Sequence, residues 1–193
     1  WYQRRVREIS IDAKVKAISK EVKYIRDQLQ NRMFVTVPNK VDPCILHISY
    51  KGPEQSAFVG GIYHLKVNLR DYPNDPPLCA VMNPNGAYIQ NQRICIIGVT
   101  AHSDKFQCGM VLDCIVESIA SMMVEDPGIE KGNGFIVEQN LVDIQRYVVE
   151  SRQWRCPECG CQHADLVDKF YGISKQTEEV QLPDFSSISF NMQ

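Results

Sequence analysis

The chain has 193 residues, 44% of them hydrophobic, and a formal net charge of −2. This length suits one domain with an appendage or two small domains, and the composition supports one ordinary globular core. A chain this close to neutral lacks the basic signature of a nucleic-acid-binding protein, and no nucleic-acid partner is expected. No apolar run is long enough to predict a membrane span, and no signal peptide is evident.

Charge is unevenly distributed along the chain. Residues 1–32 contain nine Lys or Arg against four Asp or Glu (net +5), which leaves twelve basic against nineteen acidic residues (net −7) for the rest. A basic end on an acidic body favours electrostatic steering toward an acidic partner. A solvated helix face would explain the same pattern.

The first predicted element is a long helix over residues 11–29. Ser10 is the expected N-cap because its hydroxyl can accept a hydrogen bond from the first helical turn. Apolar residues recur at steps of four and three, which places them on one stripe facing a core. They are Ile11, Val15, Ile18, Val22, Ile25 and Leu29.

Four β-like runs follow, over residues 33–37, 44–50, 63–70 and 78–82. In the second and third runs, apolar and polar residues alternate with period two, and Gly- or Pro-containing turns separate the runs. This pattern predicts an antiparallel meander with one face covered by a core.

Two more helices are predicted after a long polar stretch. Their apolar residues recur at helical spacing, and the second helix is expected to begin near Gly134. Because strands and helices are segregated along the chain, the predicted class is α+β. A Cys-rich segment begins near Arg152. The apolar positions are Leu112, Ile115, Val116, Ile119 and Met122 in one helix, and Val137, Leu141, Ile144 and Val148 in the other.

Four motifs lie in register within this order of elements. They are Phe58-Val-Gly-Gly-Ile-Tyr63, Tyr72-Pro-Asn-Asp-Pro-Pro77, Pro84-Asn85 and Ile94-Cys95-Ile96. Together they resemble the F-x-G-G-x-Y/F, Y-P-x-x-P-P, H-P-N and I-C-L motifs of the ubiquitin-conjugating (UBC) enzymes. The resemblance covers residues 11–153. It implies a UBC-like fold with an N-terminal helix, a four-stranded antiparallel meander, a long active-site loop and two C-terminal helices. Residues 154–193 remain as a separate Cys-rich tail.

The region before the cysteine departs from the usual family pattern. Asn83 replaces the first His of His-Pro-Asn, and Cys95 lies ten positions after Asn85. This longer spacing is similar to the branch anchored in the endoplasmic reticulum membrane, which Gly86, Asn91, Arg93, His102 and Asp104 also match. The expected location is cytoplasmic, or the cytosolic face of that membrane if a tail has been lost.

The resemblance implies a transferase that uses Cys95. This thiol would accept ubiquitin or a ubiquitin-like modifier as a thioester from an activating enzyme, and pass it to a substrate lysine. Asn85 would donate a hydrogen bond to the oxyanion, which a neutral carboxamide can do without a proton transfer of its own. Asp104 and His102 would assist deprotonation of the incoming lysine. No organic cofactor is expected, because the activating enzyme uses the ATP.

Other interpretations of these residues remain open. A Cys between two isoleucines is typical of a small buried hydrophobe, and Asn in a loop commonly makes a local turn. His102 and Asp104 could be polar loop residues or a helix cap. Residues 106–109 and Asn74 differ from the segments that dock ligases in many relatives, which indicates an unusual ligase partner.

A second function class follows from that divergence. The same fold could serve as a catalytically idle adaptor or structural subunit that works through its Cys-rich tail. Retention of both Cys95 and Asn85 favours the enzyme, because an adaptor needs no oxyanion donor.

The tail contains a separate candidate site. Eight cysteines without a secretory signal favour thiols or metal ligands over disulfides. Cys156 and Cys159 have the spacing of a zinc knuckle, and Cys161 and His163 could complete a structural zinc site. A half-site completed by another chain, or a patch of surface thiols, are the alternatives. The tail aromatics Phe170, Tyr171, Phe185 and Phe190 predict that it docks onto another surface.

Overall fold

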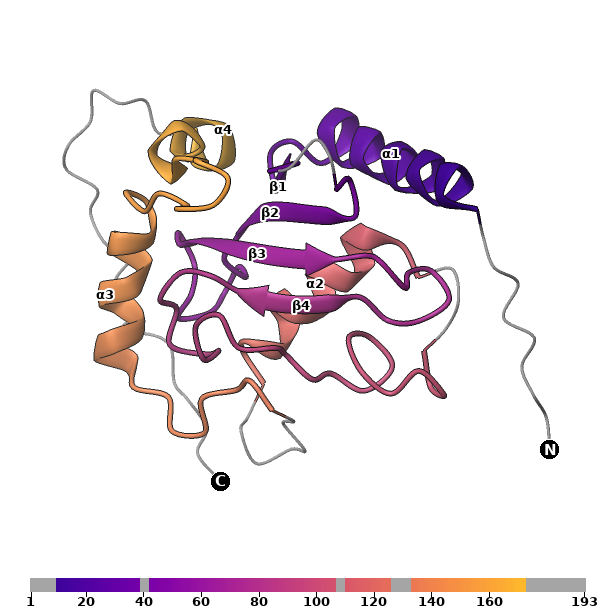
Figure 1. Cartoon of the computed structure of the whole chain (residues 1–193). Coiled ribbons are helices and arrows are strands. Elements are labelled where there is room, and N and C mark those ends of the chain that lie inside the picture. The colour runs from indigo at the N-terminus through magenta and orange to yellow at the C-terminus, as the bar shows by residue number, and fades with distance from the viewer. Residues whose placement is uncertain (1–9, 39–41, 107–109, 126–132, 173–193) are drawn as a thin grey trace.

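The computed structural model describes residues 10–38, 42–106, 110–125 and 133–172 (Figure 1). Its centre is a four-stranded antiparallel sheet in which consecutive strands are neighbours, so the predicted meander is confirmed. The helices precede and follow the sheet, as the UBC-like prediction requires. The strands are β1 (Met33–Thr36), β2 (Ile45–Lys51), β3 (Ile62–Asn68) and β4 (Leu78–Val81).

The N-terminal helix α1 (Ile11–Gln28) begins as predicted, because the Ser10 side chain accepts a hydrogen bond from Ala13 N–H at 3.3 Å. The middle of its apolar stripe is buried through Ile18, Val22 and Ile25, whereas Ile11 is exposed and lies outside the core. Within the described ranges, no helix has both the length and the apolarity needed to cross a membrane.

The hydrophobic core lies between the sheet and α2 (Leu112–Met122), which crosses behind the strands in Figure 1. The alternating apolar residues of the central strands point to this side and are fully buried. The core helix contributes residues at helical spacing to the same cluster. Its members include Leu46, Ile48, Leu65, Val67, Ile115, Val116 and Ile119.

A half-buried carboxylate, that of Glu21, connects α1 to α2. Glu21 accepts hydrogen bonds from the Leu112 N–H at 2.7 Å and from the Tyr72 hydroxyl at 2.9 Å. The residue before α2, Val111, provides no side-chain cap. The Glu21 carboxylate therefore satisfies an otherwise unpaired N–H at the start of α2. The N-cap position of α2 is thus held by Val111 and not by His102 or Asp104.

The last core helix, α3 (Leu141–Ser151), begins later than the sequence predicted. Asn140 caps it by accepting a hydrogen bond from Val142 N–H at 2.9 Å, while Val137 is 72% exposed. The preceding segment is not helical. Instead, Phe135 forms an antiparallel bridge with Tyr88, so this segment supports the long loop before Cys95.

The expectation that only one face of the sheet is covered is wrong. On the face opposite the core, His47, Ser49 and His64 are fully buried beneath the C-terminal segment. That segment contains a short 3-10 turn, η1 (His163–Asp165), and α4 (Val167–Tyr171), which is seen above α3 and to the left of β1 in Figure 1.

The tail aromatics confirm the predicted docking where they are described. Phe170 is buried against Ile62, and the Tyr171 hydroxyl donates to the Gly61 carbonyl at 2.7 Å. The tail therefore docks onto the chain's own sheet. Phe185 and Phe190 lie outside the described residues.

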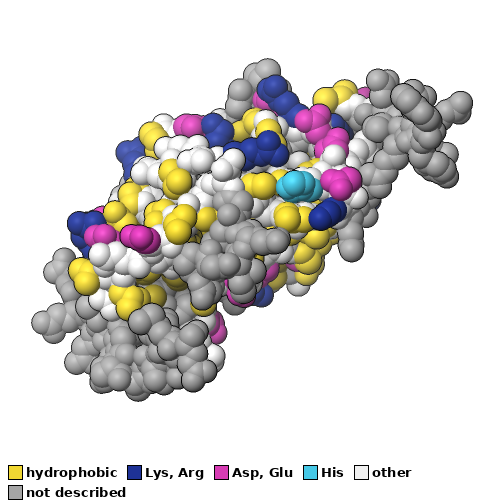
Figure 2. Space-filling model, turned by 90° about the horizontal axis from the view of Figure 1, so that it is seen from below, with side chains coloured by type: hydrophobic (Ala, Val, Ile, Leu, Met, Phe, Trp, Pro, Cys, Tyr) yellow, Lys and Arg dark blue, Asp and Glu magenta, His cyan; other side chains and the backbone are white. Residues whose placement is uncertain are grey.

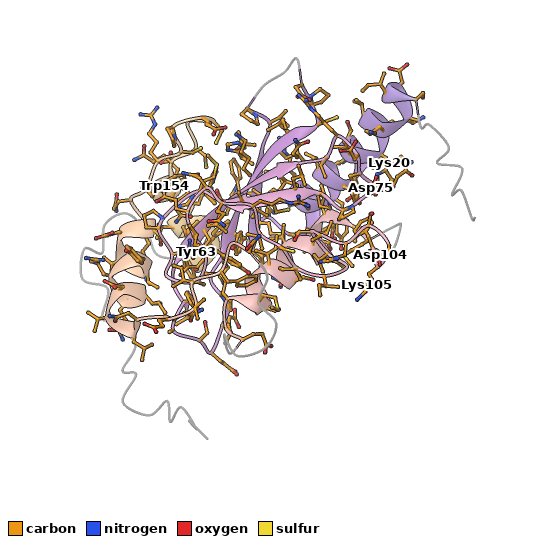
Figure 3. The ribbon with its side chains drawn as sticks, turned by 60° about the horizontal axis from the view of Figure 1, so that its bottom comes forward. Lys20, Tyr63, Asp75, Asp104, Lys105 and Trp154 are labelled. Atoms are coloured by element: carbon orange, nitrogen blue, oxygen red, sulfur yellow. The ribbon has the colours of Figure 1, made fainter. Side chains whose placement is uncertain are left out.

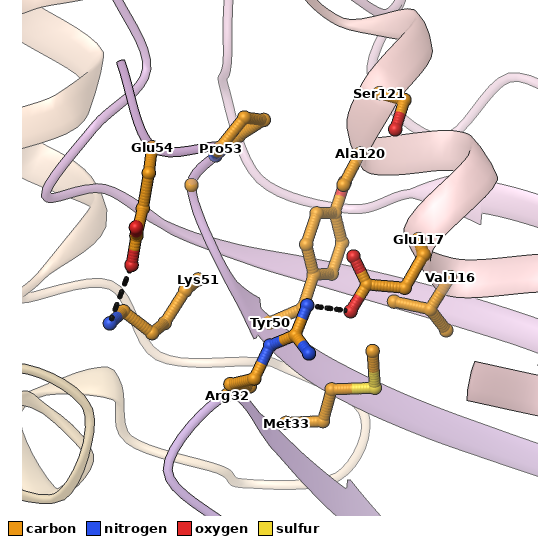
Figure 4. A pocket seen from close by; sticks show the side chains of 11 residues that line it. Arg32, Met33, Tyr50, Lys51, Pro53, Glu54, Val116, Glu117, Ala120 and Ser121 are labelled. Carbon is orange, nitrogen blue, oxygen red and sulfur yellow. Dashed lines mark hydrogen bonds and ion pairs between the residues drawn. The ribbon is translucent and has the colours of Figure 1, made fainter. Parts of the chain in front are cut away.

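A pocket of about 330 Å³ lies between the β1–β2 edge and α2 (Figure 4). An ion pair between Arg32 and Glu117 joins its two sides. The pocket is lined by neither Cys95 nor Asn85, so it is separate from the predicted catalytic residues.

Candidate functional site

Cys95 lies on a loop whose backbone is fixed immediately before and at the cysteine. Ile94 is fully buried and its N–H donates to the Cys79 carbonyl at 2.9 Å. The Cys95 N–H donates to the Asn133 carbonyl at 2.9 Å, while the Cys95 side chain remains partly exposed. The loop therefore presents a thiol to solvent from a defined position, which suits a nucleophile that must meet large partners.

Thr100 fixes the chain on both sides of the cysteine. Its buried hydroxyl donates to the Ile94 carbonyl at 2.8 Å and accepts from the Ile96 N–H at 2.9 Å. One side chain thus holds the residues before and after Cys95 in a single arrangement. Sequence reasoning missed this role, because a Thr five positions after a cysteine has no distinctive pattern.

The segment around Gly134 supports the same loop from the other side. The Gly134 carbonyl accepts a hydrogen bond from the Ile89 N–H at 2.8 Å, and the Ile136 N–H donates to the Ala87 carbonyl at 2.9 Å. Gly134 has a φ of +99°, and a Cβ added there would lie 2.5 Å from the Arg93 carbonyl oxygen. Only glycine permits this close approach of two backbones.

Asn85 is buried beneath the loop and uses its whole carboxamide. Its Oδ1 accepts from Ala87 N–H at 2.8 Å and Tyr88 N–H at 2.6 Å. Its Nδ2 donates to the Asn83 carbonyl at 3.0 Å and the Tyr88 carbonyl at 3.2 Å. These bonds shape the turn that leads toward Cys95. For Asn85 to donate to an oxyanion, one of its two donor bonds would have to be released.

His102 and Asp104 lie on an exposed turn after the cysteine. His102 has a φ of +58°, and its carbonyl accepts from Lys105 N–H at 2.9 Å. Figure 3 shows Asp104 and Lys105 at the opposite end of the molecule from Trp154. Ala101 pairs with Ile97, so the chain folds back after Cys95 before this turn begins. Both polar side chains are therefore exposed to solvent.

The basic helix offers only part of its predicted charge to a partner. Lys14 donates to the Arg70 carbonyl, and Lys23 forms an ion pair with Asp27. Lys16 and Lys20 are exposed on α1. On the face shown in Figure 2, basic and acidic side chains lie beside one another rather than forming one large patch of a single sign.

The cysteine-rich segment contributes to a cluster of possible metal ligands. Cys156 and Cys159 lie with His47 of β2 and His64 of β3, and their ligand atoms are all within 4.8 Å of one another. Burial and the neighbouring imidazoles lower the pKa of His64 to about 2, so this ring is neutral at ordinary pH. Sequence reasoning missed both histidines, because on alternating strands they resembled an outward polar face.

The other two predicted metal ligands lie beside this group. Cys161 Sγ is 3.6 Å from Ser49 Oγ, and its side chain packs against the small apolar cluster of α4. His163 Nε2 is 3.3 Å from the same Ser49 hydroxyl. The structure thus brings all four predicted residues to one face of the sheet, but only two of them into the compact cluster.

Comparison with known proteins shows sequence relatives in one family. No family model matches the chain. It is 28% identical over 166 residues to ubiquitin-conjugating enzyme E2 32 of Arabidopsis thaliana, which covers 84% of this chain and 52% of that protein. It is 32% identical over 80 residues to ubiquitin-conjugating enzyme E2 J2 of Homo sapiens, covering 41% of this chain and 31% of that protein. The chain therefore spans about half or less of these relatives' length.

A search of solved structures also finds ubiquitin-conjugating enzymes. The structure of human ubiquitin-conjugating enzyme E2 G1 aligns with 61% of this chain and 99% of its own, at 15% identity and a TM-score of 0.49. The sequence matches show that the chain is similar to E2 ubiquitin-conjugating enzymes over part of their length.

Proposed function

We propose that this chain accepts ubiquitin or a ubiquitin-like modifier on Cys95 and transfers it to a lysine amine. The observation that carries the proposal is the partly exposed Cys95 on a loop held by Thr100 and the Gly134 segment, in a chain related to E2 enzymes. The other described cysteines suit the role less well. Burial raises the pKa of Cys79 to about 12, and Cys114 lies on a helix surface without a supporting loop.

The proposed chemistry has two acyl transfers. In the first, the Cys95 thiolate attacks the thioester carbonyl on the activating enzyme, and the enzyme's cysteine leaves as a thiolate. In the second, a lysine amine attacks the new thioester, Cys95 leaves as a thiolate, and the amine proton passes to a base. Asp104 and His102 are the proposed proton acceptors, and Asn85 the proposed donor to the oxyanion.

Incubation with an activating enzyme, ATP and a panel of modifiers tests the proposal directly. We expect one modifier to form an adduct that thiol reagents cleave. Cys95→Ala should form none, and Cys95→Ser should form a thiol-resistant ester, because the serine oxygen replaces sulfur at the same position. Non-reducing gels with and without a thiol reagent distinguish these products.

Cys114→Ser provides the control, since Cys114 is another exposed cysteine of the described chain. This variant should charge like the parent. If no modifier charges the parent chain, or if Cys95→Ala still forms the thiol-sensitive adduct, Cys95 is not the acceptor. Failure of the parent with every modifier would favour the adaptor function.

The exposed lysines of α1 should contribute to the encounter with the activating enzyme. We expect Lys16→Glu with Lys20→Glu to slow charging by roughly tenfold at low salt, because reversed charge removes electrostatic steering. The difference should shrink as salt shortens the screening length to about 8 Å at physiological ionic strength. Charging rates measured across a salt series give the result.

A matched control reverses two basic residues far from α1, Arg146 on α3 and Lys169 on α4. It changes the net charge equally and should affect charging much less. Equal slowing by both double variants would show that net charge alone matters, and parental rates for the α1 variant at low salt would exclude the helix from this encounter.

A further inference from the structure

Three fully buried polar side chains lie together on the sheet face opposite the core. His47 and Ser49 extend from β2, and His64 from β3, where Ser49 pairs directly with His64. Burial of polar groups is costly unless their hydrogen-bonding or ligand capacity is satisfied. These residues are not part of the hydrophobic core cluster. Their burial is therefore explained only if another group satisfies their polar atoms.

The partner supplied by the chain is the Cys156–Cys159 turn. Cys156 Sγ is 3.4 Å from His47 Nδ1, Cys159 Sγ is 3.5 Å from His64 Nε2, and the two ring nitrogens are 3.1 Å apart. Tetrahedral zinc, with bonds of about 2.05 Å to nitrogen and about 2.3 Å to sulfur, places nitrogens about 3.3 Å apart and nitrogen about 3.6 Å from sulfur. These three separations are close to the corresponding edges of such a tetrahedron, and all four ligand atoms lie within 4.8 Å of one another.

We propose that His47 Nδ1, His64 Nε2, Cys156 Sγ and Cys159 Sγ bind one structural zinc ion. The ligands come from two strands of the sheet and from the C-terminal segment. The ion would thus fasten the C-terminal segment to the sheet. Four protein ligands leave no open coordination position, which is the arrangement of structural rather than catalytic zinc sites.

A hydrogen-bonded relay holds His64 in the tautomer that zinc requires. His163 Nδ1 lies 2.7 Å from the Ser151 carbonyl, which can only accept, so the proton is on Nδ1 and Nε2 is an acceptor. Ser49 Oγ is 3.3 Å from that Nε2 and 2.8 Å from His64 Nδ1. Ser49 can therefore donate to His163 and accept from His64. This leaves the lone pair of His64 Nε2 facing the two thiols.

A carboxylate of the knuckle lies near the outer nitrogen of His47. Glu158 Oε2 lies 3.5 Å from His47 Nε2, and Lys66 holds the same oxygen at 2.7 Å. His47 Nε2 makes no hydrogen bond among the described residues, whereas Nδ1 faces His64 Nε2 and Cys156 Sγ in the cluster. A carboxylate behind a histidine ligand is a recurrent feature of zinc sites and strengthens the ligand. His163 thus positions His64 through Ser49, whereas Cys161 packs against the apolar cluster of α4 and is not a ligand.

Metal analysis of the full chain tests the site. Protein purified with zinc present should hold about one zinc per chain, and cobalt substitution should give the absorption of a tetrahedral site with thiolate ligands. Cys156→Ser and His47→Ala should weaken zinc binding by roughly 100-fold, whereas Cys161→Ser should bind like the parent. Because two thiol protons must leave when zinc binds, affinity should rise with pH.

His47→Cys tests the zinc site even if Cys156→Ser and His47→Ala fail to fold. It should retain zinc and increase the thiolate-to-cobalt absorption, because a third sulfur joins the site. Metal-free parent protein, with a melting temperature unchanged by zinc or a chelator, would overturn the proposal. So would loss of zinc in Cys161→Ser with retention in His47→Ala, since the tail alone would then supply the ligands. Charging of Cys95 is measured separately, so either result is independent of the transferase assignment.

Discussion

Asn85→Ala should slow discharge of a Cys95 thioester to free lysine far more than it slows charging. Aminolysis develops full negative charge on the carbonyl oxygen, and removing one donor to such an oxyanion typically costs roughly 100- to 1000-fold. Both Nδ2 hydrogens of Asn85 already bond to carbonyls of the loop. Releasing one of these bonds offsets part of the stabilisation that Asn85 gives the oxyanion. We expect at least about a tenfold difference between the two steps, measured in single-turnover assays.

Asn83→Ala is the matched control for loop stability. Its buried carboxamide also bonds only to backbone, accepting from His64 N–H at 2.9 Å and donating to Ile62 at 3.0 Å. Both variants should melt earlier, because each buried unsatisfied group costs about 1 to 3 kcal/mol. Only the Asn85 variant should separate discharge from charging. A parallel loss of both steps would assign Asn85 to loop support, and parental discharge would remove it from catalysis.

Gly134→Ala should displace the Cys95 loop and destabilise the protein by about 2 to 5 kcal/mol, through left-handed strain and overpacking. The new Cβ would meet backbone, 2.5 Å from Arg93 O and 3.0 Å from Ile94 Cα, and neither can rotate away. Thermal unfolding measures the stability loss. We also expect charging of the folded variant to slow by at least about tenfold, because the nucleophile is misplaced.

Gly172→Ala isolates the conformational part of this effect. Gly172 also has a positive φ, +66°, but a Cβ there would meet nothing within 4 Å. It should cost about 1 kcal/mol and leave charging unchanged. If the two alanine variants were equally stable and equally active, the contact between Gly134 and the cysteine loop would have no functional weight.

The fold was largely predictable because local patterns and tertiary burial agree. The period-two runs became β2 and β3 with the expected residues in the core, and Ser10 caps α1 as its position suggested. The start of α3 was not predictable from periodicity. Val137 has the right spacing to Leu141, but the Asn140 cap decides where the helix begins.

The candidate sites show the limits of local pattern more clearly. Cys95 stood out through its neighbouring motifs, whereas the Thr100 hydroxyl acts by joining two backbone groups that become adjacent only in the folded loop. His47 and His64 had the alternation of solvent-facing strand residues. Their burial depends on residues about a hundred positions later in the chain, and no local signal encodes that contact. The incomplete ligand set of the Cys156–Cys159 knuckle was the only hint.

The position of the C-terminal segment also limits how other proteins can approach. With His47, Ser49 and His64 fully enclosed, β3 still exposes Lys66 at this location, where it pairs with Glu158 on the outer surface of the knuckle. A partner that recognises a bare sheet would find a different shape and chemistry here. The outer surface on this side therefore includes Glu158, Lys66 and Lys169, so the C-terminal segment changes the chemistry that a partner would meet here.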